Sequence, residues 1–111
     1  MTKVYNKLVR DRIPEIIEAS GKTCRTSVLS EADYIRMLDQ KLTEELAEYQ
    51  ESKSMEELAD LMEVIAAAAQ ARGCSWEQLM DIRNRKRTER GGFEEKILLL
   101  EVTDPQSKES T

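Results

Sequence analysis

Apolar residues recur every three or four positions through most of the chain, the spacing that places them on one face of an α-helix. This pattern predicts three long helices, over residues 31–51, 55–72 and 76–90. The first two carry regular apolar stripes, formed by Leu38, Leu42, Leu46 and Tyr49 and by Leu58, Leu61, Met62 and Ile65. We therefore expect these two helices to lie side by side, with their stripes in contact.

Serine residues mark the starts of the three long helices. Ser30 stands directly before the first, where its hydroxyl can accept a hydrogen bond from a free backbone N–H. Ser54 with Glu57, and Ser75 with Gln78, have the spacing of a capping box, in which each side chain accepts from the backbone N–H of the other residue. These signals predict helix starts near residues 31, 55 and 76.

Shorter elements complete the predicted fold. Pro14 suits the first turn of a helix and Gly21 follows its end, which predicts a short helix over 13–20. The β-branched residues of 22–29 and the aliphatic run of 96–102 predict two short strands that pair as a small sheet. The fold class is therefore mainly α, an antiparallel bundle of about four helices with a minor β element.

The length of the chain indicates one domain. Its 111 residues suffice for a single domain, which we assign to 1–103, followed by a polar, disordered tail over 104–111. Its Ala-rich and Leu-rich helix faces exceed the apolar surface that one small copy can cover. We therefore expect an oligomer, at least a dimer.

The residue inventory excludes several classes of protein. The chain has no histidine, which removes His-dependent catalysis and His metal ligands. Its net charge of −5 argues against a nucleic-acid binder. The longest apolar run, 64–69, is too short to span a membrane, and the N-terminus shows no export signal. Cys24 and Cys74 are expected to be free thiols, so we expect a cytoplasmic protein.

Two acidic pairs stand at matching positions on the first two long helices. Glu45 and Glu48 lie three residues apart on the first helix. Glu57 and Asp60 repeat this spacing on the second, so each pair shares one helix face. The short polar loop makes the helices antiparallel neighbours, which brings the four carboxylates together, while Glu44 faces solvent. Gathered carboxylates repel unless a cation lies between them, and oxygen ligands suit Mg²⁺, Mn²⁺ or Ca²⁺.

Structural interpretations of the same residues stand beside this one. Glu57 also completes a capping box, and charged pairs at this spacing are common on solvated helices in a chain that is 35% charged. Glu63, one turn past Asp60, is either a further metal ligand or a neighbour of one. Lys41, one turn before Glu45, either forms an ion pair with it or binds phosphate.

The last turns of the helix over 76–90 are strongly basic, with Arg83, Arg85, Lys86, Arg87 and Arg90. Cations at a helix C-terminus complement its dipole, but this number exceeds what a dipole needs. Lys86 and Arg90 are four residues apart and can reach one phosphate chain. Two roles, closing a site or supporting a subunit contact, stay open for the N-terminal Lys7, Arg10 and Asp11.

Together these motifs resemble the all-α nucleoside-triphosphate pyrophosphohydrolases, the superfamily of MazG, phosphoribosyl-ATP pyrophosphohydrolase and the dimeric dUTPases. The acidic motif of the family, EExxE followed by ExxD, matches residues 44–48 and 57–60. Its basic portion is similar to residues 84–86 and 90–93. The opening YNKLVRDRIP, at 5–14, resembles the short MazG-like members.

The resemblance implies hydrolysis of a nucleoside triphosphate, non-standard or surplus, to the monophosphate and pyrophosphate, with Mg²⁺ or Mn²⁺, in a homodimer or homotetramer. It implies a metal site formed by Glu45, Glu48, Glu57 and Asp60. It implies catalytic roles for Glu45, Glu48 and Lys86. It implies substrate binding by Lys41, Asn84, Lys86 and Arg90. The chemistry agrees, because only a bridging cation lets a triphosphate approach four carboxylates, one of which can deprotonate a water.

The same sequence features are compatible with two rival functions. Charged, amphipathic helices also suit a non-catalytic helical interaction module, which would bind no metal. A regulatory nucleotide-binding module would keep the pocket without turnover. Metal binding and pyrophosphate release separate the three functions.

Overall fold

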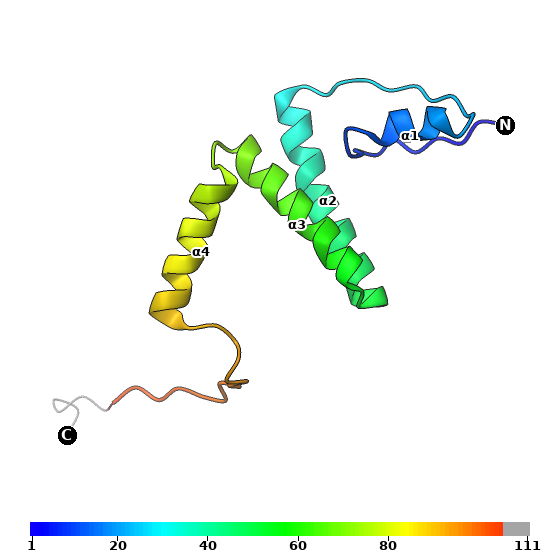
Figure 1. Ribbon diagram of the computed structural model, residues 1–111. Helices are drawn as coiled ribbons and strands as arrows, with labels where there is room; N and C mark the ends of the chain where they lie inside the picture. The colour runs from blue at the N-terminus through cyan, green and yellow to red at the C-terminus, as the bar shows by residue number, and fades with distance from the viewer. Residues whose placement is uncertain (106–111) are drawn as a thin grey trace. The chain divides into compact units, whose positions relative to one another are not determined.

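The computed structural model describes residues 1–105, which contain four helices (Figure 1). They are α1 (Ile13–Ala19), α2 (Glu31–Ser52), α3 (Met55–Ala71) and α4 (Trp76–Arg90). The predicted mainly α fold and all four predicted helices are thus confirmed. Over the same residues, each helix is too short or too polar to cross a membrane. The chain divides into two units, Met1–Leu79 and the part that begins at Met80, and each is described by itself.

The connection between α2 and α3 is set by two residues. Lys53 has a left-handed backbone (φ 58°), which ends α2, and its N–H donates to the Tyr49 carbonyl at 2.7 Å. Ser54 follows at once and caps α3, its Oγ accepting from the N–H of Glu57 at 3.2 Å. So short a connection makes the helices antiparallel neighbours, and Figure 1 shows them side by side.

The contact between α2 and α3 forms the small core of the first unit. Leu38 from α2 and Val64 from α3 are the buried apolar side chains of the described residues. Next to Leu38, the two terminal nitrogens of Arg72 donate to the carboxylate of Asp39, at 3.0 and 3.3 Å. This two-point contact joins the end of α3 to the first half of α2.

The predicted strands do not form within residues 1–105. The segments 22–29 and 96–102 have no strand hydrogen bonds, and Val28 is almost fully exposed. A strand exists only through pairing with a neighbour, and neither segment has one in the described part of a single chain. The predicted minor β element is therefore absent from residues 1–105. Of the tail predicted over 104–111, residues 106–111 lie outside the described residues.

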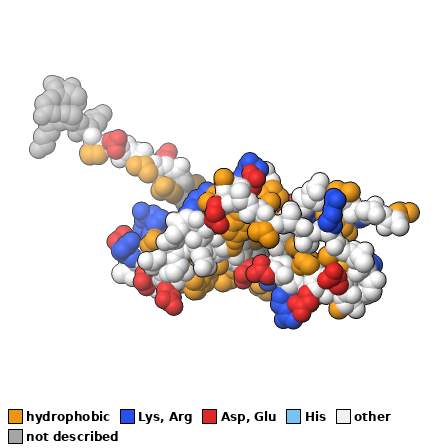
Figure 2. Space-filling model, turned by 90° about the horizontal axis from the view of Figure 1, so that it is seen from above, with side chains coloured by type: hydrophobic (Ala, Val, Ile, Leu, Met, Phe, Trp, Pro, Cys, Tyr) orange, Lys and Arg blue, Asp and Glu red, His pale blue; other side chains and the backbone are white. Residues whose placement is uncertain are grey.

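Many apolar side chains of the first unit stay exposed. Met55, Met62 and Trp76 are 67%, 52% and 40% exposed. In Figure 2, apolar side chains reach the surface beside charged ones. Met62, which was expected in the stripe against α2, thus lies on the outward face of α3. That face is apolar as well as the face against α2, a pattern typical of a helix covered on both sides.

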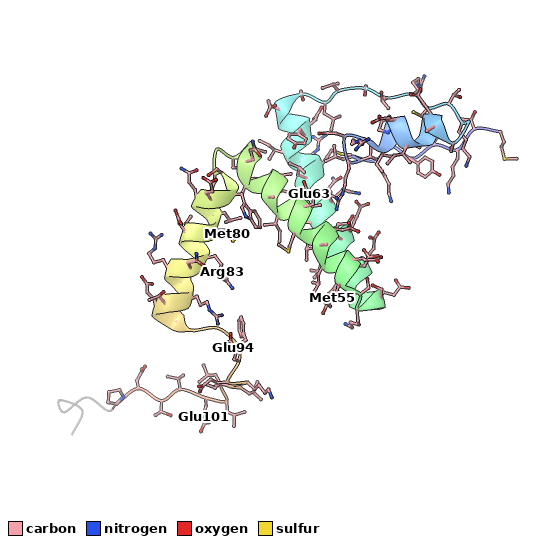
Figure 3. The ribbon with its side chains drawn as sticks, viewed as in Figure 1. Met55, Glu63, Met80, Arg83, Glu94 and Glu101 are labelled. Carbon is pink, nitrogen blue, oxygen red and sulfur yellow. The ribbon has the colours of Figure 1, made fainter. Side chains whose placement is uncertain are left out.

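The second unit contains most of α4 and the segment after it. Figure 3 marks Met80 and Arg83 on this helix and Glu94 beyond its end. Gly91 ends α4 with a left-handed backbone (φ 83°), and its N–H donates to the Arg87 carbonyl at 2.8 Å. Arg87 then forms an ion pair with Glu94, which closes the turn after the helix.

Candidate metal centre

Three carboxylates from two helices converge between α2 and α3. Glu45 of α2 and Glu57 and Asp60 of α3 each offer an oxygen atom, and these oxygens all lie within 4.8 Å of one another. The spacing of three residues places Glu57 and Asp60 on one face of α3, and the short loop brings that face against α2. The structure therefore brings together three of the four predicted metal ligands.

Glu45 is the buried carboxylate of this group. Only 7% of its surface is exposed, and its Oε2 has no hydrogen-bond donor among the described residues. Oε2 of Glu57 is also buried without a donor in that part of the chain. A buried carboxylate oxygen without a donor is costly. The arrangement of these carboxylates is therefore suited to a cation.

The pKa values of Glu45 and Glu57 reflect this crowding. Burial raises the pKa of Glu45, the negative charge of Glu48 raises it further, and the positive charge of Lys41 opposes the shift. Burial also raises the pKa of Glu57, followed by the effect of Glu48 and the other acidic neighbours. A divalent cation requires the ionised carboxylates, so metal binding would release any protons held there.

Two basic side chains reach the carboxylates. Lys41 Nζ lies 3.6 Å from Oε1 of Glu45 and 3.9 Å from Oε2 of Glu44. Arg10 Nη2 donates to Oδ1 of Asp60 at 2.6 Å. The ion-pair interpretation of Lys41 is confirmed. The predicted difference between the neighbouring glutamates is confirmed too, because the side chain of Glu44 is 44% exposed and that of Glu45 10%.

Glu48 lies at the exposed side of the centre. Its negative charge raises the pKa of both Glu45 and Glu57. It is not one of the three residues whose oxygens converge. Glu48 is therefore a neighbour of the candidate metal ligands, placed where a water molecule can reach it.

Glu57 does not complete the capping box at the start of α3. Ser54 accepts from the Glu57 N–H, but the N–H of Ser54 donates to Oγ of Ser52 at 3.2 Å. The carboxylate of Glu57 instead takes part in the acidic group. The local interpretation of this residue is thus half right, since its backbone serves the cap and its side chain does not.

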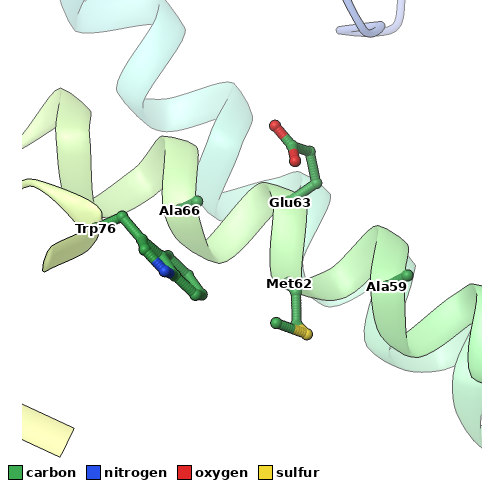
Figure 4. A pocket seen from close by; sticks show the side chains of 5 residues that line it. All are labelled: Ala59, Met62, Glu63, Ala66 and Trp76. Atoms are coloured by element: carbon green, nitrogen blue, oxygen red, sulfur yellow. The ribbon is translucent and has the colours of Figure 1, made fainter. Parts of the chain in front are cut away.

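Glu63 does not join the acidic group. It is exposed and helps to line a hollow of about 400 Å³ on the outward side of α3, together with Ala59, Met62, Ala66 and Trp76. In Figure 4 its carboxylate points away from the side chains of Met62 and Trp76. The hollow is therefore largely apolar, with Glu63 at its border.

The predicted basic residues belong to the second unit. Lys86 and Arg90 line a hollow of about 400 Å³ together with Arg83, Arg87 and the residues Gly91, Gly92 and Phe93. Asn84 does not line it, and its Oδ1 accepts a hydrogen bond from Arg83 at 3.0 Å. Arginine and lysine gathered around a concave surface suit a phosphate group.

The sequence did not reveal the contact between Arg10 and Asp60. These residues are 50 positions apart, and helix periodicity relates only residues within a few turns. The charge of Arg10 and its place in the N-terminal motif were the available signals, and they left its role open between the site and a subunit contact.

Comparisons with known proteins add little to this geometry. No family model matches the chain, and no solved structure matches it. An uncharacterised protein of Mycolicibacterium smegmatis is 57% identical over 42 residues, which are 38% of this chain and 43% of that protein. The match thus spans less than half of the relative and carries no statement of function.

Proposed function

We propose that this protein is a metal-dependent nucleoside-triphosphate pyrophosphohydrolase, which converts a non-standard or surplus nucleotide and water to the monophosphate and pyrophosphate. The observation that carries this proposal is the buried Oε2 of Glu45, which has no donor within residues 1–105 and belongs to the group formed with Glu57 and Asp60. The resemblance of the acidic and basic motifs to MazG-like proteins supports the class of reaction.

The donor set fits Mg²⁺ or Mn²⁺. The converging side chains of Glu45, Glu57 and Asp60 are all carboxylates, without the nitrogen and sulfur ligands that favour zinc. When bound, the metal would polarise phosphoryl oxygens and lower the pKa of water. The side chain of Asp60 is 45% exposed, which leaves an open side for substrate.

The residues of the first unit divide into a fixed and an accessible group. Glu45 is held by burial and by the nearby Lys41, so it can fix the position of a cation. Glu48 is exposed and adjoins the converging carboxylates, so we assign to it the orientation and deprotonation of the attacking water. Lys41 is the candidate to shift from Glu45 to a phosphate oxygen.

The second unit supplies a separate surface for phosphate. Lys86 and Arg90 lie four residues apart on α4 and line the same basic hollow. We assign to them the binding of phosphate oxygens and of the pyrophosphate product, with Lys86 stabilising the charge that develops on the leaving group. Asn84 is the candidate for a hydrogen bond to substrate.

The exposed apolar face of α3 supports the proposed homodimer or homotetramer. Leu38 and Val64 alone are a small core for the described residues, whereas Met55, Met62 and Trp76 remain accessible. A second copy placed on this face would turn an α2–α3 pair into a four-helix arrangement. We expect light scattering to give at least twice the monomer mass of 12.8 kDa, and a monomer at micromolar concentration would contradict this.

The free thiols of Cys24 and Cys74 support the proposed cytoplasmic location.

The experiment that tests the proposal compares two neighbouring glutamates. Glu45→Gln keeps the size of the side chain but removes a ligand charge, and we expect turnover to fall at least about a hundredfold, roughly 3 kcal/mol of barrier. Glu44→Gln alters an exposed neighbour and should change activity little. The assay is pyrophosphate release with Mg²⁺ from a set of standard and damaged nucleoside triphosphates, beside a thermal melt.

The outcomes separate the three functions. Equal activity of the two variants would contradict the catalytic role of Glu45, and loss of activity with unfolding would make Glu45 a residue of the fold. A wild type that binds nucleotide but releases no pyrophosphate would be a regulatory nucleotide binder. The interaction module, which the exposed apolar face of α3 also favours, predicts neither metal binding nor nucleotide binding.

A further inference from the structure

The contact between Arg10 and Asp60 joins the N-terminal segment to the candidate metal centre. Arg10 Nη2 lies 2.6 Å from Oδ1 of Asp60, and both side chains are about half exposed, at 55% and 45%. Asp60 is one of the three converging carboxylates. A guanidinium group therefore sits on the solvent side of the centre, on an oxygen of a candidate metal ligand.

The position of Arg10 is fixed by the start of α1. Its carbonyl accepts a hydrogen bond from the N–H of Ile13 at 3.0 Å, so the backbone turns directly into the helix at this point. Nearby Arg12 has a different partner, because its Nε donates to Glu15 of α1 at 3.2 Å. Of these two arginines, only Arg10 reaches the centre, and the anchored backbone keeps it there when its partner changes.

An ion pair this exposed adds little to stability. Half-exposed pairs between basic and acidic side chains contribute at most about 1 kcal/mol, so the fold does not depend on this one. Its effect falls on Asp60, whose charge is neutralised by a group that cannot lose its proton. A divalent cation that binds Asp60 must compete with Arg10 for the carboxylate.

The chemistry of arginine suits a second partner at the same place. The planar guanidinium presents paired N–H donors that fit a carboxylate or a phosphate equally well. A triphosphate held at the centre would bring phosphate oxygens to the exposed side, where Arg10 lies. The side chain can then change partner by rotation, without movement of α1.

We propose that Arg10 holds Asp60 while the centre lacks its metal, and that it turns to the phosphate chain of the substrate once the metal binds Asp60. This inference rests on the proposed function, because it takes the ligand to be a triphosphate. It makes Arg10 a substrate-binding residue that also weakens metal binding in the absence of substrate. Removing Arg10 should therefore raise the affinity for metal and lower the affinity for substrate. A residue that only supported the fold would not change the two affinities in opposite directions.

The test measures Mn²⁺ binding by electron paramagnetic resonance, and then the binding of inorganic triphosphate to the Mn²⁺-loaded protein by calorimetry. In Arg10→Gln the metal loses its competitor, so we expect Mn²⁺ affinity to rise about threefold to fivefold. The affinity for triphosphate should fall at least about tenfold, because a charge-assisted, two-point contact is lost. Arg10→Lys should keep the competition but bind triphosphate more weakly than the wild type.

Arg12→Gln is the matched control, since Arg12 lies two positions away and pairs with Glu15. It should leave both affinities unchanged. If Arg10→Gln weakens Mn²⁺ binding and lowers the melting temperature, Arg10 supports the fold and the proposal is overturned. Unchanged triphosphate binding would overturn it as well.

Failure of this inference can be told apart from failure of the proposed function. A wild type that binds Mn²⁺ and triphosphate without releasing pyrophosphate from any nucleotide would remove the reaction but leave the role of Arg10 standing. A wild type that hydrolyses nucleotides, with both affinities insensitive to Arg10→Gln, would do the reverse.

Discussion

The helices α3 and α4 begin with the same sequence pattern but use it differently. At α4 the capping box is closed, because Ser75 Oγ accepts from the N–H of Gln78 at 3.1 Å and Gln78 Oε1 accepts from the N–H of Ser75 at 2.9 Å. At α3 the serine half forms, but Ser52 takes the place of the glutamate half. The side chain of Gln78 thus caps α4, whereas that of Glu57, at the same position of the pattern, does not cap α3.

The difference shows which of the two side chains serves the fold. Gln78 satisfies a backbone N–H that would otherwise lack a partner at the start of a helix. Glu57 satisfies none, and its buried Oε2 lacks a donor among the described residues. A carboxylate that joins a group of like charges, instead of accepting a hydrogen bond at the start of its helix, destabilises the folded state unless a cation binds to that group. We infer that Glu57 is placed for a cation rather than for the helix.

The largest expected effect concerns stabilisation by metal. Mg²⁺ binds only the folded centre, so at a concentration a hundred times its Kd it should add about 2.7 kcal/mol to the unfolding free energy of the wild type. Glu57→Gln should lose most of this gain, and Asp60→Asn should do the same. Thermal melts across a series of Mg²⁺ concentrations measure it.

Gln78→Glu is the control for metal stabilisation, since it gives the start of α4 the pattern found at α3. It should keep the full gain, because it leaves the converging carboxylates intact. A melting temperature of the wild type that does not respond to millimolar Mg²⁺ would remove the distinction between the two helix starts and favour the interaction module.

A smaller effect concerns the caps themselves. Gln78→Ala opens the closed box at α4, so the unfolding free energy should fall by about 0.5–1 kcal/mol. Glu57→Gln in metal-free protein should not lower it, because Ser52 already serves the N–H of Ser54 and one repelling charge is removed. Urea denaturation in the presence of a chelator compares the two variants. A loss of stability in Glu57→Gln as large as in Gln78→Ala would mean that both side chains are caps.

The helices were predictable because their signals are local. The serine caps, Pro14 and the glycines define helix ends within a residue or two, so the predicted 31–51 and 55–72 agree with Glu31–Ser52 and Met55–Ala71. The predicted strands failed for the opposite reason. A run such as 96–102 favours extended backbone, but a strand also needs a neighbour that no local pattern specifies.

The candidate centre was predictable in part for the same reason. Spacing along each helix and a short loop suffice to bring Glu45 close to Glu57 and Asp60. Whether the carboxylate of Glu48 faces the centre depends on how the two helices cross. The sequence predicted Glu48 as a metal ligand, whereas its carboxylate lies next to the three that converge. Arg10 reaches the centre because of the path of the N-terminal segment before α1. That segment has no regular apolar spacing from which its path could be predicted.

The smallest expected effect is a pH dependence of opposite sign at the two helix starts. In metal-free protein the pKa of Glu57 is raised, chiefly by burial and by the charge of Glu48. The folded state then binds more protons than the unfolded state between the ordinary glutamate pKa of about 4.3 and the raised value. The contribution of Glu57 to the free energy of unfolding is therefore favourable at low pH and is lost as pH rises through this window.

The glutamate of Gln78→Glu should behave in the opposite way. Its carboxylate would accept the Ser75 N–H near the positive end of the α4 dipole, which lowers its pKa. Its contribution should be present above the ordinary pKa and lost as pH falls. Urea denaturation with a chelator, over a series of pH values from 4 to 7, gives each contribution as a difference: wild type minus Glu57→Gln, and Gln78→Glu minus wild type. Because both are differences, the carboxylate of Glu94, whose pKa is lowered mainly by its hydrogen bond with Arg87, cancels. Slopes of the same sign would show that Glu57 is held as a cap is, and the contrast between the two helix starts would be wrong.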